Sequence, residues 1–172
     1  MRRAKARIRA TMFCRRCLRI PRLAVLLALT TMMLAACAGP PPDLDLRTVA
    51  RNGRPSETLA CPPGYCTASA DLAVGDFPVA PEQLAAIARA AITAMPRTTL
   101  LRDDAARGRF VAEQRSAVLR FVDTVWVEVV PRGSAASSVA ILSRSNVGYY
   151  DFGVNRRRVE GLLADIAARA AR

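Results

Sequence analysis

A run of arginines near the C-terminus carries the most distinctive chemistry of the sequence. Between Arg144 and Arg158 the chain combines one carboxylate, Asp151, with two glycines and, directly after Asn155, three successive arginines. Asparagine is a favoured helix cap, and arginines in the first turn that follows are unfavourable unless an anion lies nearby. Guanidinium groups and free backbone N–H groups both bind phosphates and carboxylates, so we predict an anion-binding site. Its residues would be Arg144, Asn155, Arg156 and Arg158.

The same run has a plainer interpretation, which the sequence leaves open. Asp151 could pair with one of the arginines, and the two glycines could serve only a tight turn. The remaining arginines would then be solvated surface charges, which seldom contribute more than a little stability.

Two carboxylates, Asp123 and Asp151, offer a second kind of chemistry. Asp123 interrupts an apolar strand pattern, and a buried carboxylate can work as an acid or base. A hydrolase using this pair is therefore the alternative to a non-catalytic domain. The structural interpretation is an ion pair between Asp123 and Arg120 or Arg144, because structural carboxylates are often perturbed as well.

Missing residue types exclude much of the remaining catalytic chemistry. The chain has no histidine, and its single lysine is Lys5. Catalytic triads, lysine Schiff bases and histidine-rich metal sites in their usual forms therefore have no candidates. We expect no catalytic residue, no metal and no cofactor, and we favour a domain that binds a ligand or plays a structural part.

The same C-terminal run resembles an uncharacterised family catalogued as domain of unknown function 1499. The resemblance extends over about residues 54–168 and implies a family and a fold, but no activity, substrate or catalytic residue. The upstream Phe121 and Asp123 fit the family's pattern, although Thr124 stands where a second acid is usual. The other matching residues are Arg144, Ser145, Gly148, Asp151, Gly153, Val154, Asn155, Arg156 and Arg158.

The elements that would position these residues follow from hydrophobic periodicity. Apolar residues recur at helical spacing between Pro81 and Pro96, and again from Val159 to the end of the chain. Residues 108–115, 118–131 and 137–145 are extended in pattern, and the last two runs are joined by a short turn. We predict an α+β domain over residues 56–172, with a three- to four-stranded antiparallel sheet and both helices packed on one face.

The N-terminal 36 residues are typical of an export signal. They contain nine basic residues and no acidic one, followed by an uncharged run of twelve residues, Leu23–Leu34. That run is too short to span a bilayer, which needs about 20 residues. Leu34-Ala35-Ala36-Cys37 resembles the bacterial lipobox, so we predict a signal peptide over 1–36, cleavage before Cys37 and lipid on that cysteine. The alternative is an ordinary signal peptide with an unmodified Cys37.

A lipid on Cys37 would hold the protein on a membrane, on the periplasmic side of the cell envelope. Ala38 stands where many inner-membrane lipoproteins have aspartate, which favours the outer membrane. An anionic envelope lipid or polymer is then the expected ligand of the arginine site. Since the leader accounts for nine of the net +12 charges, the rest of the chain carries only +3, and we expect no nucleic-acid partner.

The remaining cysteines and the proline-rich segment complete the predictions. Cys61 and Cys66 flank Pro62-Pro63-Gly64-Tyr65, whose turn-forming residues favour a disulfide in an oxidising compartment, the alternative being two free thiols. Residues 37–55 begin with a stiff proline-rich stretch and lack periodicity, so we expect a tether between the lipid and the domain.

Overall fold

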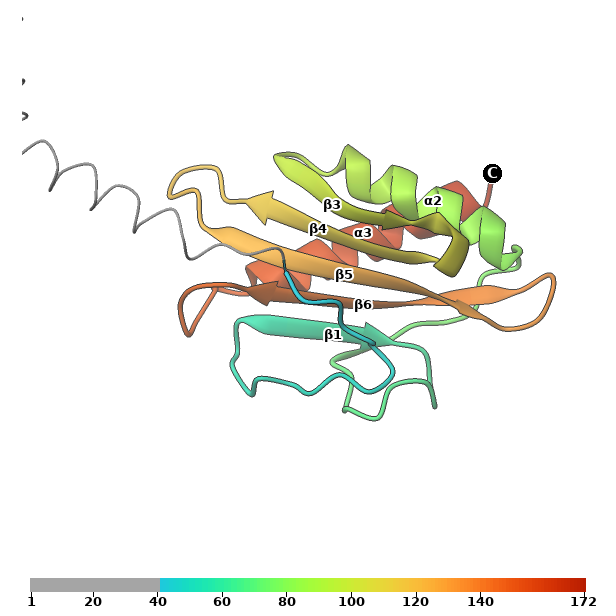
Figure 1. The fold of residues 1–172 in the computed structure, drawn as a ribbon, viewed down its shortest axis with the longest axis horizontal. Coiled ribbons are helices and arrows are strands. Elements are labelled where there is room, and N and C mark those ends of the chain that lie inside the picture. The colour runs from blue at the N-terminus through green and yellow to red at the C-terminus, as the bar shows by residue number, and fades with distance from the viewer. Residues whose placement is uncertain (1–40) are drawn as a thin grey trace, which may run out of the picture. The chain divides into compact units, whose positions relative to one another are not determined.

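The computed structural model describes residues 41–172, so the predicted signal peptide and Cys37 lie outside the described residues. The described chain has an α+β fold in which two helices pack on a six-stranded sheet (Figure 1). The strand order is β2-β1-β6-β5-β4-β3, with all pairs antiparallel except the parallel pair β1–β2. The elements are β1 (Glu57–Cys61), β2 (Leu72–Ala73), α2 (Pro81–Ala94), β3 (Thr98–Asp104), η1 (Ala105–Arg107), β4 (Arg109–Arg115), β5 (Val122–Pro131), β6 (Ser137–Ser145) and α3 (Val154–Ala170).

Both predicted helices are confirmed, and they cover the same face of the sheet. Helix α2 starts at Pro81, whose fixed φ suits the first helical position, and α3 runs almost to the C-terminus. Their apolar stripes meet alternate residues of β4, β5 and β6 in one core, as the period of two along each strand requires. The buried residues that form this contact include Leu84, Ala88, Ile92, Val159, Leu162 and Ile166 from the helices and Phe110, Val125, Val127, Val139 and Ile141 from the strands.

The predicted number of strands was wrong, because three strands have weak sequence patterns. All five residues of β1 are buried, so this strand shows no alternation between apolar and polar residues. The edge strand β3 contains adjacent leucines and a register shift between Leu100 and Arg102, and β2 has only two residues. The expected strand over 118–131 also starts late, at Val122, and residues 116–121 form a loop.

The other face of the sheet is covered by the N-terminal part of the described chain. Leu46 is only 1% exposed and packs with Trp126 and Leu142 in a second core. The indole N–H of Trp126 donates a hydrogen bond to the backbone oxygen of Pro42 over 3.0 Å. The segment that we expected to be a tether up to residue 55 is therefore attached to the sheet from Pro42 onward. Two isolated apolar residues, Leu46 and Val49, were too few to give a periodic signal.

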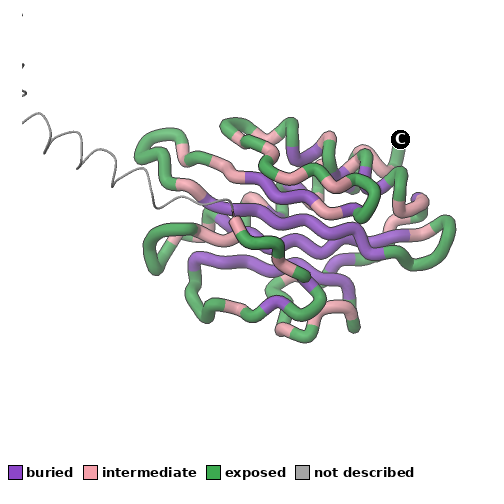
Figure 2. The backbone as a smooth tube through the Cα atoms, in the orientation of Figure 1, coloured by how far each residue is buried: buried purple, intermediate pink, exposed green. Residues whose placement is uncertain are grey.

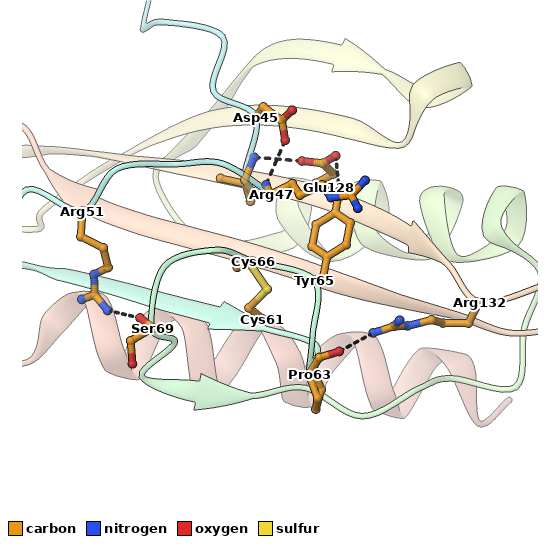
Figure 3. Close-up of a disulfide and its surroundings, with 11 residues drawn as sticks. Asp45, Arg47, Arg51, Cys61, Pro63, Tyr65, Cys66, Ser69, Glu128 and Arg132 are labelled. Carbon is orange, nitrogen blue, oxygen red and sulfur yellow. Dashed lines mark hydrogen bonds between the residues drawn. A yellow bond between two sulfur atoms is a disulfide. The ribbon is translucent and has the colours of Figure 1, made fainter.

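The predicted disulfide joins Cys61, at the end of β1, to Cys66 (Figure 3). The two Cα atoms are 6.2 Å apart, and the turn between them is closed by a hydrogen bond from the Tyr65 N–H to the Pro62 oxygen. The turn directs Tyr65 toward β5, where its hydroxyl donates to the Glu128 carboxylate over 2.7 Å. The disulfide loop thereby covers part of the second core.

Candidate functional site

A hollow in the described chain lies at one end of the sheet, between the β4–β5 loop and the β6–α3 loop. It encloses about 480 Å³, and its mouth is formed largely by apolar side chains. In Figure 1 this is the left-hand end of the sheet, and Figure 2 shows exposed loops there beside the buried middle of the strands. The lining residues are Ser116, Ala117, Val118, Leu119, Phe121, Asp123, Ser145, Val147, Gly148, Tyr150, Asp151, Phe152 and Val154.

The rim of this pocket exposes an unusual number of large apolar side chains. Leu119 is 69% exposed and Phe152 is 79% exposed, although both are residues that folded proteins usually bury. Six further side chains at the same end are also exposed: Val118, Phe121, Val147, Tyr149, Tyr150 and Val154. Contiguous exposed apolar surface of this kind marks interaction sites in folded proteins.

The β4–β5 loop is held in place by its own backbone. The Ser116 N–H donates to the Phe121 oxygen, and the Phe121 N–H donates to the Ser116 hydroxyl, both over 2.9 Å. Arg120 takes a left-handed backbone conformation with φ of 54°. This closed turn leaves the side chains of Val118 and Leu119 pointing to solvent instead of into the sheet.

Below the rim, Asp123, Ser145 and Asp151 form the polar floor of the pocket. Behind this floor they join a polar network centred on Arg158, which does not itself line the pocket. Its guanidinium donates to the Asp123 carboxylate over 2.6 Å, to the Gln114 side-chain oxygen over 2.6 Å and to the Ser143 hydroxyl over 2.8 Å. It also donates to the side-chain oxygen of Asn155. The Arg158 and Asp123 side chains are only 5% and 9% exposed, so a buried ion pair joins α3 to β5. The hydrogen bonds to Gln114 and Ser143 join α3 to β4 and β6.

Asp151, and not Asn155 as predicted, caps helix α3. The Asp151 carboxylate accepts hydrogen bonds from the backbone N–H groups of Gly153 and Asn155 over 2.9 and 2.7 Å. Gly153 is the N-cap residue, and its left-handed φ of 74° suits glycine. Asn155 lies inside the first turn, fully buried, and its amide donates to Asp151, Ser145 and the Ser56 oxygen. A carboxylate at this end of a helix is also favoured by the helix dipole.

The four residues of the predicted anion site do not come together. Arg144 lies on the sheet face opposite the helices, where it pairs with the buried Glu57 carboxylate over 2.8 Å and lies over the Trp126 ring. Arg156 is exposed and pairs with Glu160 one helical turn later. Only Asn155 and Arg158 are neighbours, and both serve the internal network. The cause is strand alternation, which sends Arg144 to one face while Ser143 and Ser145 face α3.

Both motif carboxylates line the pocket, but each is already engaged. Asp123 pairs with Arg158, not with Arg120 or Arg144 as the sequence suggested, because the Arg158 side chain reaches from the start of α3 to the start of β5. Both oxygens of the Asp151 carboxylate accept hydrogen bonds, one from the Gly153 N–H and the other from the N–H and the side-chain amide of Asn155. The pair therefore works as part of the scaffold of the pocket floor.

Sequence reasoning missed the apolar rim and several partners in the floor. Gln114, Ser143 and Ser56 carry no local signal, because each meets the network from a separate strand or strand end. The rim did have a signal. Adjacent apolar residues at 118–119 and 149–150 lie in segments that also contain turn-forming residues. Such segments form loops at the surface, so their apolar side chains are exposed.

A second polar cluster, on the opposite face, holds the N-terminal segment to the sheet. The buried Glu128 carboxylate accepts a hydrogen bond from the Tyr65 hydroxyl (Figure 3). It also accepts hydrogen bonds from the Leu46 N–H and from Arg109. Burial and the hydrogen bond to Glu128 both raise the pKa of Tyr65 above its ordinary value. Burial alone would lower the pKa of Arg109, but Glu128 outweighs it and the pKa is raised. All partners are internal, so this cluster is structural.

Comparison with known families gives a match that covers most of the chain. Residues 37–166 match the family described as "Protein of unknown function (DUF1499)". No curated protein matches the chain. Within residues 41–172, no helix is long and apolar enough to cross a membrane.

Similar solved structures are distant. The di-domain ARO/CYC BexL from the BE-7585A biosynthetic pathway is 14% identical with a TM-score of 0.41, over 58% of this chain and 46% of that one, so the match spans less than half of that protein. A solution structure from Thermobifida fusca is 13% identical with a TM-score of 0.41, over 67% and 93%. A crystal structure of TTHA0849 from Thermus thermophilus is 12% identical with a TM-score of 0.36, over 67% and 97%. Likeness at this level carries no argument about function.

Proposed function

Because the chain belongs to the DUF1499 family, whose function is unknown, its activity has to be argued from its own residues, and we propose a lipid-anchored, non-catalytic binding protein of the cell envelope. The observation that carries this proposal is the pocket at the end of the sheet, with its apolar rim above a closed polar floor. Ligand sites are typically concave and mostly apolar, with a few polar groups that fix orientation.

The chemistry of the rim favours an amphiphilic ligand with an apolar chain. Val118, Leu119, Phe121 and Phe152 offer apolar contacts, while the charges of the floor are consumed by their own partners. An anionic head group outside the mouth would meet Arg120, which is exposed on the β4–β5 loop. The anionic envelope ligand expected from the sequence thus stays part of the proposal, but the four residues first assigned to it do not.

Binding is favoured over hydrolysis by the state of the carboxylates. A general acid or base needs a proton that it can exchange with the substrate. Asp123 is held by Arg158, and Asp151 by two backbone N–H groups, so both carboxylates are committed to fixed partners. No specific observation therefore favours the hydrolase.

The anchor is supported by the lipobox-like sequence before Cys37 and by the basic and apolar leader that precedes it. Two or three acyl chains give stable membrane attachment, whereas one gives only marginal binding. We propose lipid on Cys37 and a periplasmic location, at the outer membrane in preference to the inner. Metabolic labelling with radioactive palmitate tests this, and label retained by Cys37→Ser would contradict it.

The binding proposal can be tested on residues 41–172, which form a compact unit with cores on both sheet faces. Titration with a dansyl-labelled fatty acid should give saturable fluorescence enhancement in the wild type, reduced in Phe121→Ser. Leu101→Ser is the matched control, because Leu101 is also a large, partly exposed apolar residue but lies on β3 away from the pocket. Equal binding by the two variants, or no binding by the wild type, would contradict the proposal.

A further inference from the structure

The apolar rim belongs to two loops that are firmly built yet turn their apolar side chains outward. The β4–β5 loop is closed by the Ser116–Phe121 hydrogen bonds, and in the β6–α3 loop Tyr150 and Phe152 make an edge-to-face ring contact at 5.1 Å between centroids. Leaving such side chains in water forfeits the free energy that burial would provide. The loops are therefore shaped to meet an apolar surface.

The distance from the proposed lipid to the folded domain is short. Pro42 is fixed by the hydrogen bond to Trp126, and Asp43 pairs with Arg102. Only five peptide units separate Cys37 from Pro42, and these span at most about 17 Å. Had residues 37–55 been a free tether, the reach would have been roughly 60 Å. The attachment of Pro42 and Asp43 thus keeps the domain close to whatever membrane holds the lipid.

That reach allows either end of the sheet to face the membrane. The exposed side chains at the two ends indicate which end does so. Trp126 is four residues from Val122 and five from Pro131, so the two ends of β5 lie about 13 and 16 Å away along the strand. The β5–β6 turn at the second end is Arg132-Gly133-Ser134-Ala135-Ala136, which has no large apolar residue. The first end exposes leucine, valine, phenylalanine and tyrosine, and tyrosine is enriched at membrane interfaces.

Charge also fits a membrane surface at the apolar end. Arg120 on the β4–β5 loop and Arg157 at the start of α3 are exposed. Arg115 and Arg156 are exposed as well, but they pair with Glu113 and Glu160. The two carboxylates that line the pocket, Asp123 and Asp151, are held by internal partners. Basic residues beside an apolar patch attract anionic lipids.

We propose that the loops at residues 116–121 and 146–153 dock on the bilayer that carries the Cys37 lipid and insert their apolar side chains into its surface. This inference rests on the proposed lipid anchor, and it makes the pocket mouth face the membrane. An apolar chain could then pass from the bilayer into the pocket without crossing water. The domain has two attachments to the membrane, the lipid and the loops, and the loops fix its orientation.

The experiment places a tryptophan at each of two positions in the lipidated protein, reconstituted into vesicles of phosphatidylethanolamine and phosphatidylglycerol. Phe152→Trp reports on the rim, and Leu101→Trp is the matched control on β3. The fluorescence of the single natural tryptophan, Trp126, is measured in the lipidated wild-type protein and subtracted. Replacing the lipids by bromine-labelled ones should quench the fluorescence at position 152 and leave position 101 unchanged. Adding Leu119→Glu to Phe152→Trp should abolish the quenching.

Each contrary result has a separate meaning. Protein that floats with the vesicles but shows no bromine quenching at position 152 would overturn loop insertion and leave the anchor intact. Protein that does not float would contradict the anchor on which this inference depends. Quenching at position 152 by a brominated monomeric fatty acid, without quenching by brominated bilayers, would also overturn docking and assign the rim to a free ligand alone.

Discussion

The buried ion pair between Arg158 and Asp123 gives the sharpest test of how α3 is held on the sheet. In Arg158→Met the aliphatic stem is largely kept, but the Asp123 carboxylate loses its charged partner while it remains only 9% exposed. Removing one member of a buried pair typically costs about 3–5 kcal/mol, because the other charge is left uncompensated. That is a large part of the total stability of a small domain, which is on the order of 5–15 kcal/mol. Gln114 and Ser143 lose their hydrogen bonds to Arg158 as well, which adds to the loss.

Urea unfolding of residues 41–172, followed by the fluorescence of the buried Trp126, measures this loss. Arg156→Met is the matched control, since its ion pair with Glu160 is about half exposed and should contribute less than about 1 kcal/mol. The double variant Asp123→Leu, Arg158→Met removes both charges, so its loss should be smaller than the sum of the two single losses. Strictly additive losses, or equal stability of Arg158→Met and Arg156→Met, would refute the role assigned to the pair.

Three further predictions concern the face opposite the helices. Leu46→Ala should lower the free energy of unfolding by about 2–4 kcal/mol, because Leu46 is fully buried, and thermal unfolding would show no loss if the segment were a loose tether. Replacing Cys61 and Cys66 by alanine should cost about 2 kcal/mol for a loop this short, measured by urea unfolding against the wild type with and without reductant. The raised pKa of Tyr65 adds stability that is complete below its unfolded pKa of about 10 and is lost as the pH rises through the folded value. Tyr65→Phe should therefore weaken the fall in stability above pH 10, and an unchanged pH profile would contradict the assignment.

The elements predicted from the sequence were those with a long and regular pattern. Helix α2 and strands β5 and β6 alternate or repeat over nine residues or more. Their predicted bounds lie close to the observed ones, except that β5 starts four residues later than expected. Strand β1 was not predicted because layers on both faces of the sheet bury all of its residues, so its sequence does not alternate between apolar and polar. The covering layer was not predicted because it depends on few residues, chiefly Leu46, and its core includes Trp126 and Leu142, which are 80 and 96 positions away in the sequence.

Four polar residues at the candidate site were predicted from the sequence, but neither their geometry nor the apolar rim was. Asp123, Asp151, Asn155 and Arg158 do meet at one place, since the start of α3 returns to the start of β5. The sequence did not show which arginine would reach Asp123. That pairing depends on which face of β6 carries Arg144 and on the direction in which α3 points Arg158, and tertiary packing sets both. The N-cap position of α3 was predicted at Asn155, two residues after the observed N-cap Gly153. Asp151 and Asn155 are both good capping types, and only the positive φ of Gly153 shows which of them caps the helix.

The arginines that suggested a ligand site instead show how this fold balances its charges. Each arginine pairs with a carboxylate from a different part of the chain: Arg144 with Glu57, Arg156 with Glu160 and Arg158 with Asp123. A buried carboxylate needs such a partner, and an arginine that already has one offers little to an outside anion. By contrast, the apolar side chains of the two neighbouring loops have almost no internal partner, although the loops that carry them are held by hydrogen bonds. The residues of the resemblance thus fix α3 on the sheet and position the loops, and the surface left for a ligand or a membrane is the apolar one.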